Sequence, residues 1–139
     1  MDYCLDWKAE PTEWCVREVV YHLLGTPPGG IHSVVQGILS GELTEYELWA
    51  DQSNITPDRQ AKDMTGLRED IDVLFQGLEQ ALDSATDDDL SGKPVVAHIR
   101  SRGIDEERNV DVLLERGFAG HWWEHLNQIV ELRASLGLS

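Results

Sequence analysis

The segment that most constrains the fold is an amphipathic stretch near the C-terminal end of the chain. At about 100° per residue, one helical face collects apolar side chains and two histidines, namely Leu114, Phe118, His121, His125, Ile129, Leu132 and Leu136. The spacing predicts a helix whose buried face carries His121 and His125. Because side chains at i and i+4 lie about 5–6 Å apart at Cβ, both imidazoles can reach one metal ion at about 2.0–2.1 Å.

A metal site has to be weighed against an ordinary core role for these rings. A single inward-facing histidine is usually a hydrogen-bonded core residue, and that interpretation stays open for each ring taken alone. Two neighbouring imidazoles in an apolar stripe need two sets of buried hydrogen-bond partners, whereas one shared cation satisfies both. The pair therefore favours a metal site.

Composition and charge restrict the class of protein. The chain has 139 residues, of which 41% are hydrophobic and 27% charged, and this fits one globular domain over residues 1–139. With 26 acidic and 11 basic residues the net charge is −15, which opposes binding to nucleic acid and anionic lipid. The chain starts without a signal-like segment and has no run of 18 apolar residues, so we expect a cytoplasmic protein without membrane contact. Cys4 and Cys15 are expected to be reduced thiols, with a single bridge as the alternative.

Two helices are predicted in the first third of the chain. Apolar positions from Val16 to Leu23 follow helical spacing, and His22 lies about 100° from the centre of their stripe, where an exposed or interfacial side chain is expected. The sequence Gly-Thr-Pro-Pro-Gly-Gly over residues 25–30 ends this helix. A short helix over Ile31–Leu39 follows, and Gly41 is its predicted stop.

The middle of the chain predicts a loop and then the longest helix. Residues 42–54 are interpreted as an acidic loop held to the core by its aromatic side chains and able to form one wall of a cleft. Thr56 as N-cap and Pro57 at the first helical position predict a helix of about 28 residues that ends near Ala85.

The pattern is less regular between this helix and the histidine stretch. Residues 86–89 are interpreted as a linker or the cap of a short turn, and residues 93–103 fit either an extended piece or one helical turn. Asp105 is predicted to begin the last helix, which continues through the histidine pair to Leu136.

Two stretches together resemble the DinB/YfiT-like family of metal-dependent enzymes. They are residues 13–23, Glu-Trp-Cys-Val-Arg-Glu-Val-Val-Tyr-His-Leu, and residues 121–129, His-Trp-Trp-Glu-His-Leu-Asn-Gln-Ile. In that family an early helix opens with Trp-Ser/Thr and ends in His-Leu, and the last helix carries His-x-x-x-His. The resemblance implies that His22, His121 and His125 bind one divalent metal, Zn²⁺ or Ni²⁺, and leave a position open for water or substrate. It also implies an all-α fold, an up-down helical bundle with three long helices and one short helix.

The chain departs from the family pattern at three places. The family has a full helix before the Trp-Ser stretch, whereas 13 residues precede Trp14 here; residues 25–30 interrupt the long second helix; and Cys15 replaces the hydroxyl residue. Without the first helix, apolar faces of the bundle are left bare. We therefore expect a homodimer whose second subunit covers them, with a rearranged bundle as the alternative.

Two functional hypotheses follow from these observations. In the first, the chain is a metal-dependent enzyme that ionises a thiol or water, and the resemblance implies transfer of a small thiol co-substrate by a low-molecular-weight-thiol S-transferase. Glu18, Glu124 and Gln128 lie within a turn of a ligand and are candidates to orient the imidazoles, or else surface polar residues. In the second, the chain is a non-catalytic dimeric helical module with a structural metal or no metal.

Overall fold

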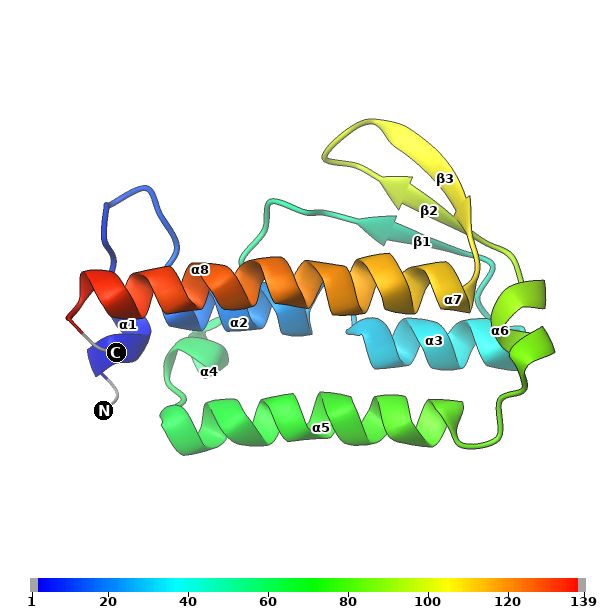
Figure 1. The fold of residues 1–139 in the computed structure, drawn as a ribbon, viewed down its shortest axis with the longest axis horizontal. Helices are drawn as coiled ribbons and strands as arrows, with labels where there is room; N and C mark the ends of the chain where they lie inside the picture. The colour runs from blue at the N-terminus through cyan, green and yellow to red at the C-terminus, as the bar shows by residue number, and fades with distance from the viewer. Residues whose placement is uncertain (1–2, 138–139) are drawn as a thin grey trace.

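The computed structural model describes residues 3–137 and shows long helices with a small sheet over one end (Figure 1). The helices are α1 (Tyr3–Asp6), α2 (Val16–Leu24), α3 (Ile31–Ser40), α4 (Pro57–Gln60), α5 (Met64–Leu82), α6 (Asp87–Gly92), α7 (Val110–Val112) and α8 (His121–Ser135). A π-helical segment, η1 (Leu113–Gly120), joins α7 to α8, so that one continuous helical run crosses the molecule. The strands are β1 (Glu45–Leu48), β2 (Val95–Ile99) and β3 (Ile104–Arg108).

The sheet makes the fold a mixed one, and the prediction of an all-α up-down bundle is wrong. The strand order is β1-β2-β3, with β1 parallel to β2 and β2 antiparallel to β3. β2 alternates buried and partly exposed side chains, and its buried residues Val95, Ala97 and Ile99 pack in the main core with Val110 and Leu113. This alternation gives the strand one apolar face, which the helical run covers.

β3 occupies the segment that was predicted to begin the last helix at Asp105. All its side chains except Ile104 are polar, and one cross-strand pair joins it to β2: His98 Nδ1 lies 2.7 Å from Asp105 Oδ1. At the other edge of the sheet Arg100, just after β2, donates to Glu47 of β1 at 2.8 Å. The last helix instead starts at Val110, where the Asn109 side chain accepts a hydrogen bond from the Val112 N–H. Polar edge strands such as β3 carry no apolar period that a sequence pattern can detect.

The predicted helix of about 28 residues is in fact two helices. Thr56 caps the one-turn helix α4, and Asp63 then caps α5 by accepting from the Gly66 N–H. Between them, the buried Arg17 guanidinium donates hydrogen bonds to the carbonyl oxygens of Arg59 and Lys62. The side chain from α2, and not a further helical turn, supplies the donors for these carbonyl oxygens. The helix is therefore interrupted between α4 and α5.

The first two predicted helices are confirmed, together with the break over residues 25–30. α2 packs against α5 and α8, and α3 packs against α5. Gly41, the predicted stop of this helix, ends α3 in the left-handed conformation, with φ 81°. Cys4 and Cys15 are free thiols. In residues 3–137, no helix has the length and apolar character needed to cross a membrane.

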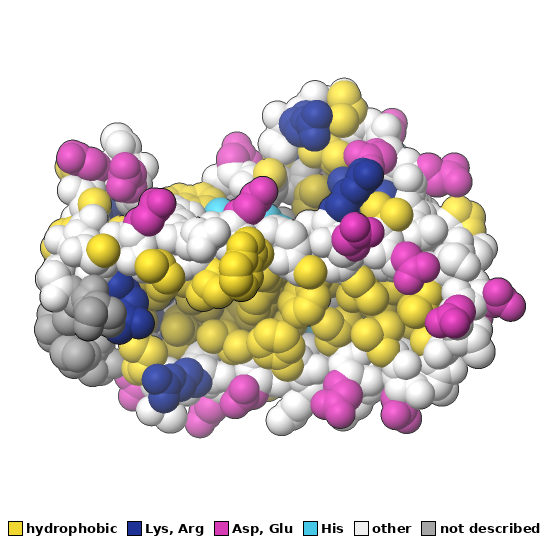
Figure 2. Space-filling view, viewed as in Figure 1, with side chains coloured by type: hydrophobic (Ala, Val, Ile, Leu, Met, Phe, Trp, Pro, Cys, Tyr) yellow, Lys and Arg dark blue, Asp and Glu magenta, His cyan; other side chains and the backbone are white. Residues whose placement is uncertain are grey.

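One face of the molecule keeps an apolar groove between α5 and α8, with α2 at its floor. Hydrophobic side chains fill this region in Figure 2, where α8 lies above and α5 below. The groove has a volume of about 290 Å³ and is lined by Val20, Leu23, Ile71, Ala119, Trp122, Trp123, Leu126 and Ile129. Part of the apolar surface of these helices is therefore exposed, as expected, at Trp123 and Leu126 of α8.

Candidate metal centre

Three histidines from two helices converge on one point. His22 stands in the last turn of α2, whereas His121 and His125 occupy the first two turns of α8. Their ring centroids are 4.8–5.0 Å apart, and one ligand atom from each lies within 4.8 Å of the other two. The structure thus brings together all three residues predicted to form the site.

Hydrogen bonds orient two of the rings toward this point. His22 Nδ1 lies 2.7 Å from the carbonyl oxygen of Gln52, and His125 Nδ1 lies 2.8 Å from Oε1 of Gln128. Since both oxygens accept, both Nδ1 atoms carry the proton, which leaves each Nε2 with a free lone pair. A hydrogen-bonded Nδ1 and a free Nε2 are what a metal-binding imidazole requires.

The third ring, His121, faces His22 directly. The two Nε2 atoms are 3.0 Å apart, and without a metal the His121 Nε2–H donates to the lone pair of His22. Two nitrogens bound to one Zn²⁺ at about 2.0–2.1 Å in tetrahedral geometry lie roughly 3.3 Å apart. To bind one ion through both Nε2 atoms, the pair needs a small shift in position and the His121 proton must move from Nε2 to Nδ1. Three imidazoles suit Zn²⁺ and Ni²⁺. The group could therefore hold a metal ion.

Burial keeps these imidazoles neutral. His22 is fully buried, and burial lowers its pKa below the ordinary value of 6.5. Burial, together with charge repulsion from His22 and His125, lowers the pKa of His121 to about 4. Both rings are neutral at pH 7 as a result, and only the neutral form has a lone pair for a metal.

The backbone around the histidines explains their convergence. In the π-helical segment η1, the His121 N–H donates to the carbonyl of Arg116, five residues back. The wider turns of this segment change the direction in which the side chains of α8 point. The indole of Trp14 lies beside the cluster, 4.8 Å from the His22 ring and 6.3 Å from the His125 ring. Asn54, at φ 63°, donates to the carbonyl oxygens of Tyr21 and His22 and thereby ties the loop carrying Gln52 to the end of α2.

A cavity of about 440 Å³ opens beside His121. It lies between the sheet and the helical run, and its walls come from the break after α2, from β1, from β3 and from η1 with the start of α8. Thr26, His121 and Glu124 line it at the histidine cluster. The segment predicted as a loop over residues 42–54 contributes Tyr46, Leu48 and Ala50 to one wall. Part of that segment is β1, so the loop prediction is wrong at Glu45–Leu48, whereas the predicted cleft wall is present.

The three residues predicted as candidates to orient the imidazoles make different contacts in the structure. Gln128 does bind an imidazole, whereas Glu18 accepts from the Cys15 N–H and pairs with Lys8 at 3.0 Å. Glu124 lines the cavity. The sequence did not predict that the Gln52 carbonyl would bind His22 or that His22 would be fully buried. Its periodicity placed this ring on the flank of the helix, where an exposed or interfacial side chain was expected. The early His-Leu motif is the only sequence signal that marks His22.

In comparisons with known proteins, no family model, no curated protein and no solved structure matches this chain. The geometry of the site is therefore the basis for its functional interpretation.

Proposed function

We propose that the chain is a metal-dependent enzyme in which His22, His121 and His125 bind one Zn²⁺ or Ni²⁺. The observation that carries this proposal is the position of the cluster: three imidazoles meet, and one of them, His121, lines a cavity. A structural metal site is closed by protein ligands, whereas a catalytic site with three protein ligands keeps a position for substrate. A cluster of three histidines with a cavity beside one of them fits the second arrangement.

The proposed reaction is transfer of a small thiol to an electrophilic carbon, as the DinB/YfiT-like resemblance implies. The bound metal would supply a Lewis acid that lowers the pKa of a thiol or water. In thiol transfer the S–H bond breaks, an S–C bond forms, and the leaving group departs with its electron pair. Glu124, one helical turn from His121 in the cavity wall, is placed to take the thiol proton.

Metal content tests the ligand assignment directly. Protein purified without a histidine tag should contain one divalent metal per chain, and His121→Ala should lose it. His98→Ala is the matched control, since His98 lies on β2 and pairs with Asp105 outside the cluster. If elemental analysis finds the same tightly bound metal in parent and His121→Ala, the assignment is wrong.

Catalysis requires a second measurement. Metal-loaded protein should accelerate the reaction of 2-mercaptoethanol or L-cysteine with monobromobimane, which forms a fluorescent thioether and releases bromide and a proton. His121→Ala should remove the acceleration, and His98→Ala should keep it. Equal rates for metal-loaded and metal-free protein would contradict the catalytic proposal.

A non-catalytic dimeric module is the second candidate, and the apolar groove between α5 and α8 favours it. Four large side chains in and around the groove are strongly exposed: Trp123 at 65%, Val130 at 57%, Leu126 at 46% and Phe75 at 43%. Together they expose on the order of 400 Å² of apolar surface, about half of what one partner buries in a stable interface. A second copy of the chain, seated groove to groove about a two-fold axis, supplies an apolar surface of the same kind.

A further inference from the structure

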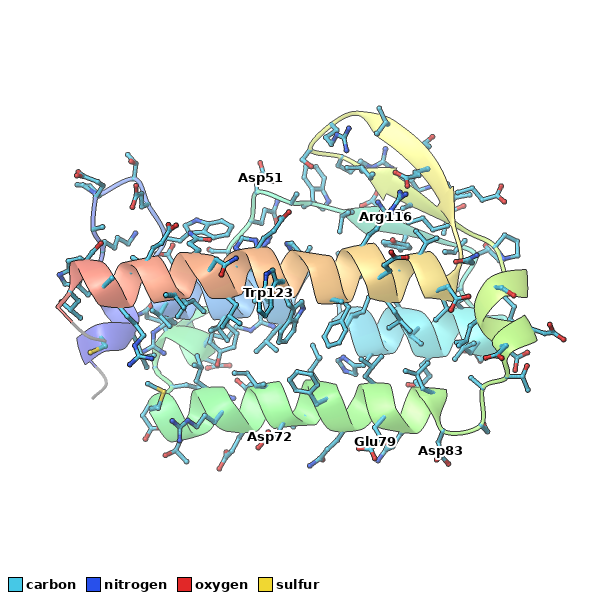
Figure 3. The ribbon with its side chains drawn as sticks, in the orientation of Figure 1. Asp51, Asp72, Glu79, Asp83, Arg116 and Trp123 are labelled. Atoms are coloured by element: carbon cyan, nitrogen blue, oxygen red, sulfur yellow. The ribbon has the colours of Figure 1, made fainter. Side chains whose placement is uncertain are left out.

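The cavity beside His121 has a second polar end, at the inner face of the sheet. Strand register places Tyr46 of β1 and Glu106 of β3 on either side of Ala97, and Arg108 follows two residues after Glu106 on the same face. Tyr46 and Arg108 line the cavity, and so does Arg116 from η1. Figure 3 places Arg116 between η1 and the sheet.

Arg108 has unused hydrogen-bonding capacity at this end. Its side chain is only 10% exposed, and its buried Nε has no hydrogen-bond partner among the described residues. The Nε lies 3.5 Å from Glu106 Oε1, an ion pair without hydrogen-bond geometry. A buried guanidinium N–H that lacks an acceptor is costly, and a ligand oxygen would supply the missing acceptor.

Tyr46 offers a second donor at the same place. Its hydroxyl oxygen accepts a hydrogen bond of 3.2 Å from Arg108 Nη1, so the phenolic hydrogen is available for another acceptor. The residue is 8% exposed, and burial raises its pKa, which keeps the hydroxyl protonated. Two buried side chains therefore present an N–H and an O–H for which residues 3–137 supply no hydrogen-bonded acceptor.

The local charge balance fits a single negative charge. Glu106 pairs with both guanidiniums, 3.5 Å from Arg108 Nε and 3.3 Å from Arg116 Nη1. Among the described residues, Glu106 is the only carboxylate paired with either arginine, so one of the two guanidinium charges has no ion-pair partner of its own. Glu115 of η1 and Glu124 of α8 also line the cavity, but neither pairs with Arg108 or Arg116 in the described part of the chain.

We propose that this cavity binds a small molecule through a carboxylate, held by Arg108 and Tyr46, and directs its other end to His121. The inference rests on the proposed metal site for the role of that second end, and it names the substrate class. The cavity follows the helical run from Leu113 to Glu124, roughly 15 Å at 1.5 Å per residue. A short chain with a carboxylate at one end and a thiol at the other fits this length.

Calorimetric titration of metal-loaded protein tests the assignment. The ligands are 3-mercaptopropionate, 6-mercaptohexanoate and 8-mercaptooctanoate, each compared with the mercaptoalcohol of equal length. For at least one length the carboxylate should bind about 10- to 100-fold more tightly than the alcohol, as expected for hydrogen bonds to a charged group. Equal affinities at all three lengths would overturn the proposal.

Variants identify the residues responsible. Arg108→Gln should abolish the preference for carboxylate over alcohol, and Tyr46→Phe should reduce it about threefold to tenfold, while Arg100→Gln should preserve it. Arg100 is the matched control because it pairs with Glu47 and does not line the cavity. If Arg108→Gln fails to fold, as judged by circular dichroism, Tyr46→Phe decides: an unchanged preference in that variant would overturn the proposal.

A titration of metal-free protein separates this inference from the proposed enzyme. Octanoate against octanol reports the carboxylate end alone. If octanoate binds more tightly than octanol and Arg108→Gln removes the difference, the carboxylate site is supported even where metal binding fails. If the protein binds metal but shows no preference for octanoate, the carboxylate site is overturned and the metal proposal stands. Tighter binding of octyl phosphate than of octanoate would overturn the assignment of a carboxylate.

Discussion

The helical run from Val110 to Ser135 has two faces that are covered to very different degrees. One face turns His121 and His125 toward α2, where Trp14, the end of α2 and the loop at Gln52 surround them. The other face carries Trp123, which is 65% exposed and lies on the near side of α8 in Figure 3. Two histidines of this run are thus turned inward and partly buried, whereas one of its two tryptophans is largely exposed.

This contrast reverses the usual distribution of side chains between core and surface. Enclosing three imidazoles is costly unless a partner satisfies them, and a metal ion is one such partner. Exposing an apolar face is costly until another surface covers it. The two faces lead to two separate predictions, a metal ion at the enclosed face and a second copy of the chain at the exposed face.

The largest expected effect is the loss of stability on removing the metal. At a free metal concentration about 1,000 times the Kd, binding only to the folded state adds about 4 kcal/mol to the free energy of unfolding. Dialysis against a chelator should then lower the Tm by roughly 10 °C or more. Differential scanning calorimetry with and without metal measures this shift, and His121→Ala should show none. If the Tm is unchanged after confirmed metal loss, the enclosed histidines do not need an ion for the stability of the fold.

The next effect concerns the open face. If a second copy covers the groove, the chain should sediment as a dimer at low micromolar concentration, well above the 15.7 kDa of one chain. Trp123→Asp should raise the dimer Kd by about 30- to 300-fold, since aromatic residues near the centre of an interface contribute about 2 kcal/mol or more. Trp49→Asp is the control, because Trp49 is 40% exposed but does not line the groove. A stable monomer of the parent chain would refute the dimer.

Local patterns predicted the segments that build both faces. The i, i+4 spacing of His121 and His125, the apolar run from Val16 and the Pro-Gly break at residues 25–30 act over a few residues, so a single sequence shows them. His22 needed the family resemblance, because its burial depends on α8, far along the chain. The fold class was wrong for a similar reason: β3 is held by pairs such as His98–Asp105 and not by an apolar period of its own.

Contacts between distant residues account for the other misses. Arg17 separates α4 from α5 through carbonyls 42 and 45 residues away, and the Gln52 carbonyl that orients His22 lies 30 residues away. The proposed carboxylate-binding end of the cavity joins Tyr46 to Arg108, which are 62 residues apart. No spacing rule connects such pairs, so their roles follow from the sheet and not from the sequence pattern.

The smallest expected effect is the pH dependence of the metal-free protein, to which the enclosed histidines contribute together with the partly buried His32 of α3. His121 has a pKa of about 4 in the folded chain and an ordinary value of 6.5, and the pKa of His22 is also lowered by burial. Between about pH 6.5 and pH 4 the unfolded state therefore binds more protons than the folded state, so the free energy of unfolding should fall as the pH falls. Carboxyl groups with lowered pKa values contribute at lower pH: Asp6, hydrogen-bonded to Arg17, acts mainly below its ordinary value of 3.8, and Glu18 mainly below 4.5.

Urea unfolding at several pH values, in the presence of a chelator, measures this slope. His121→Gln should make the slope shallower between pH 6.5 and pH 4, because one of the three histidines whose pKa burial lowers, His22, His32 and His121, is gone. His98→Gln is the control and should keep the parent slope, since His98 lies on the sheet and pairs with Asp105 and Glu45. If the free energy of unfolding of His121→Gln keeps the parent's dependence on pH, then His121 is open to solvent in the metal-free protein. The burial of this face would then depend on a bound ion.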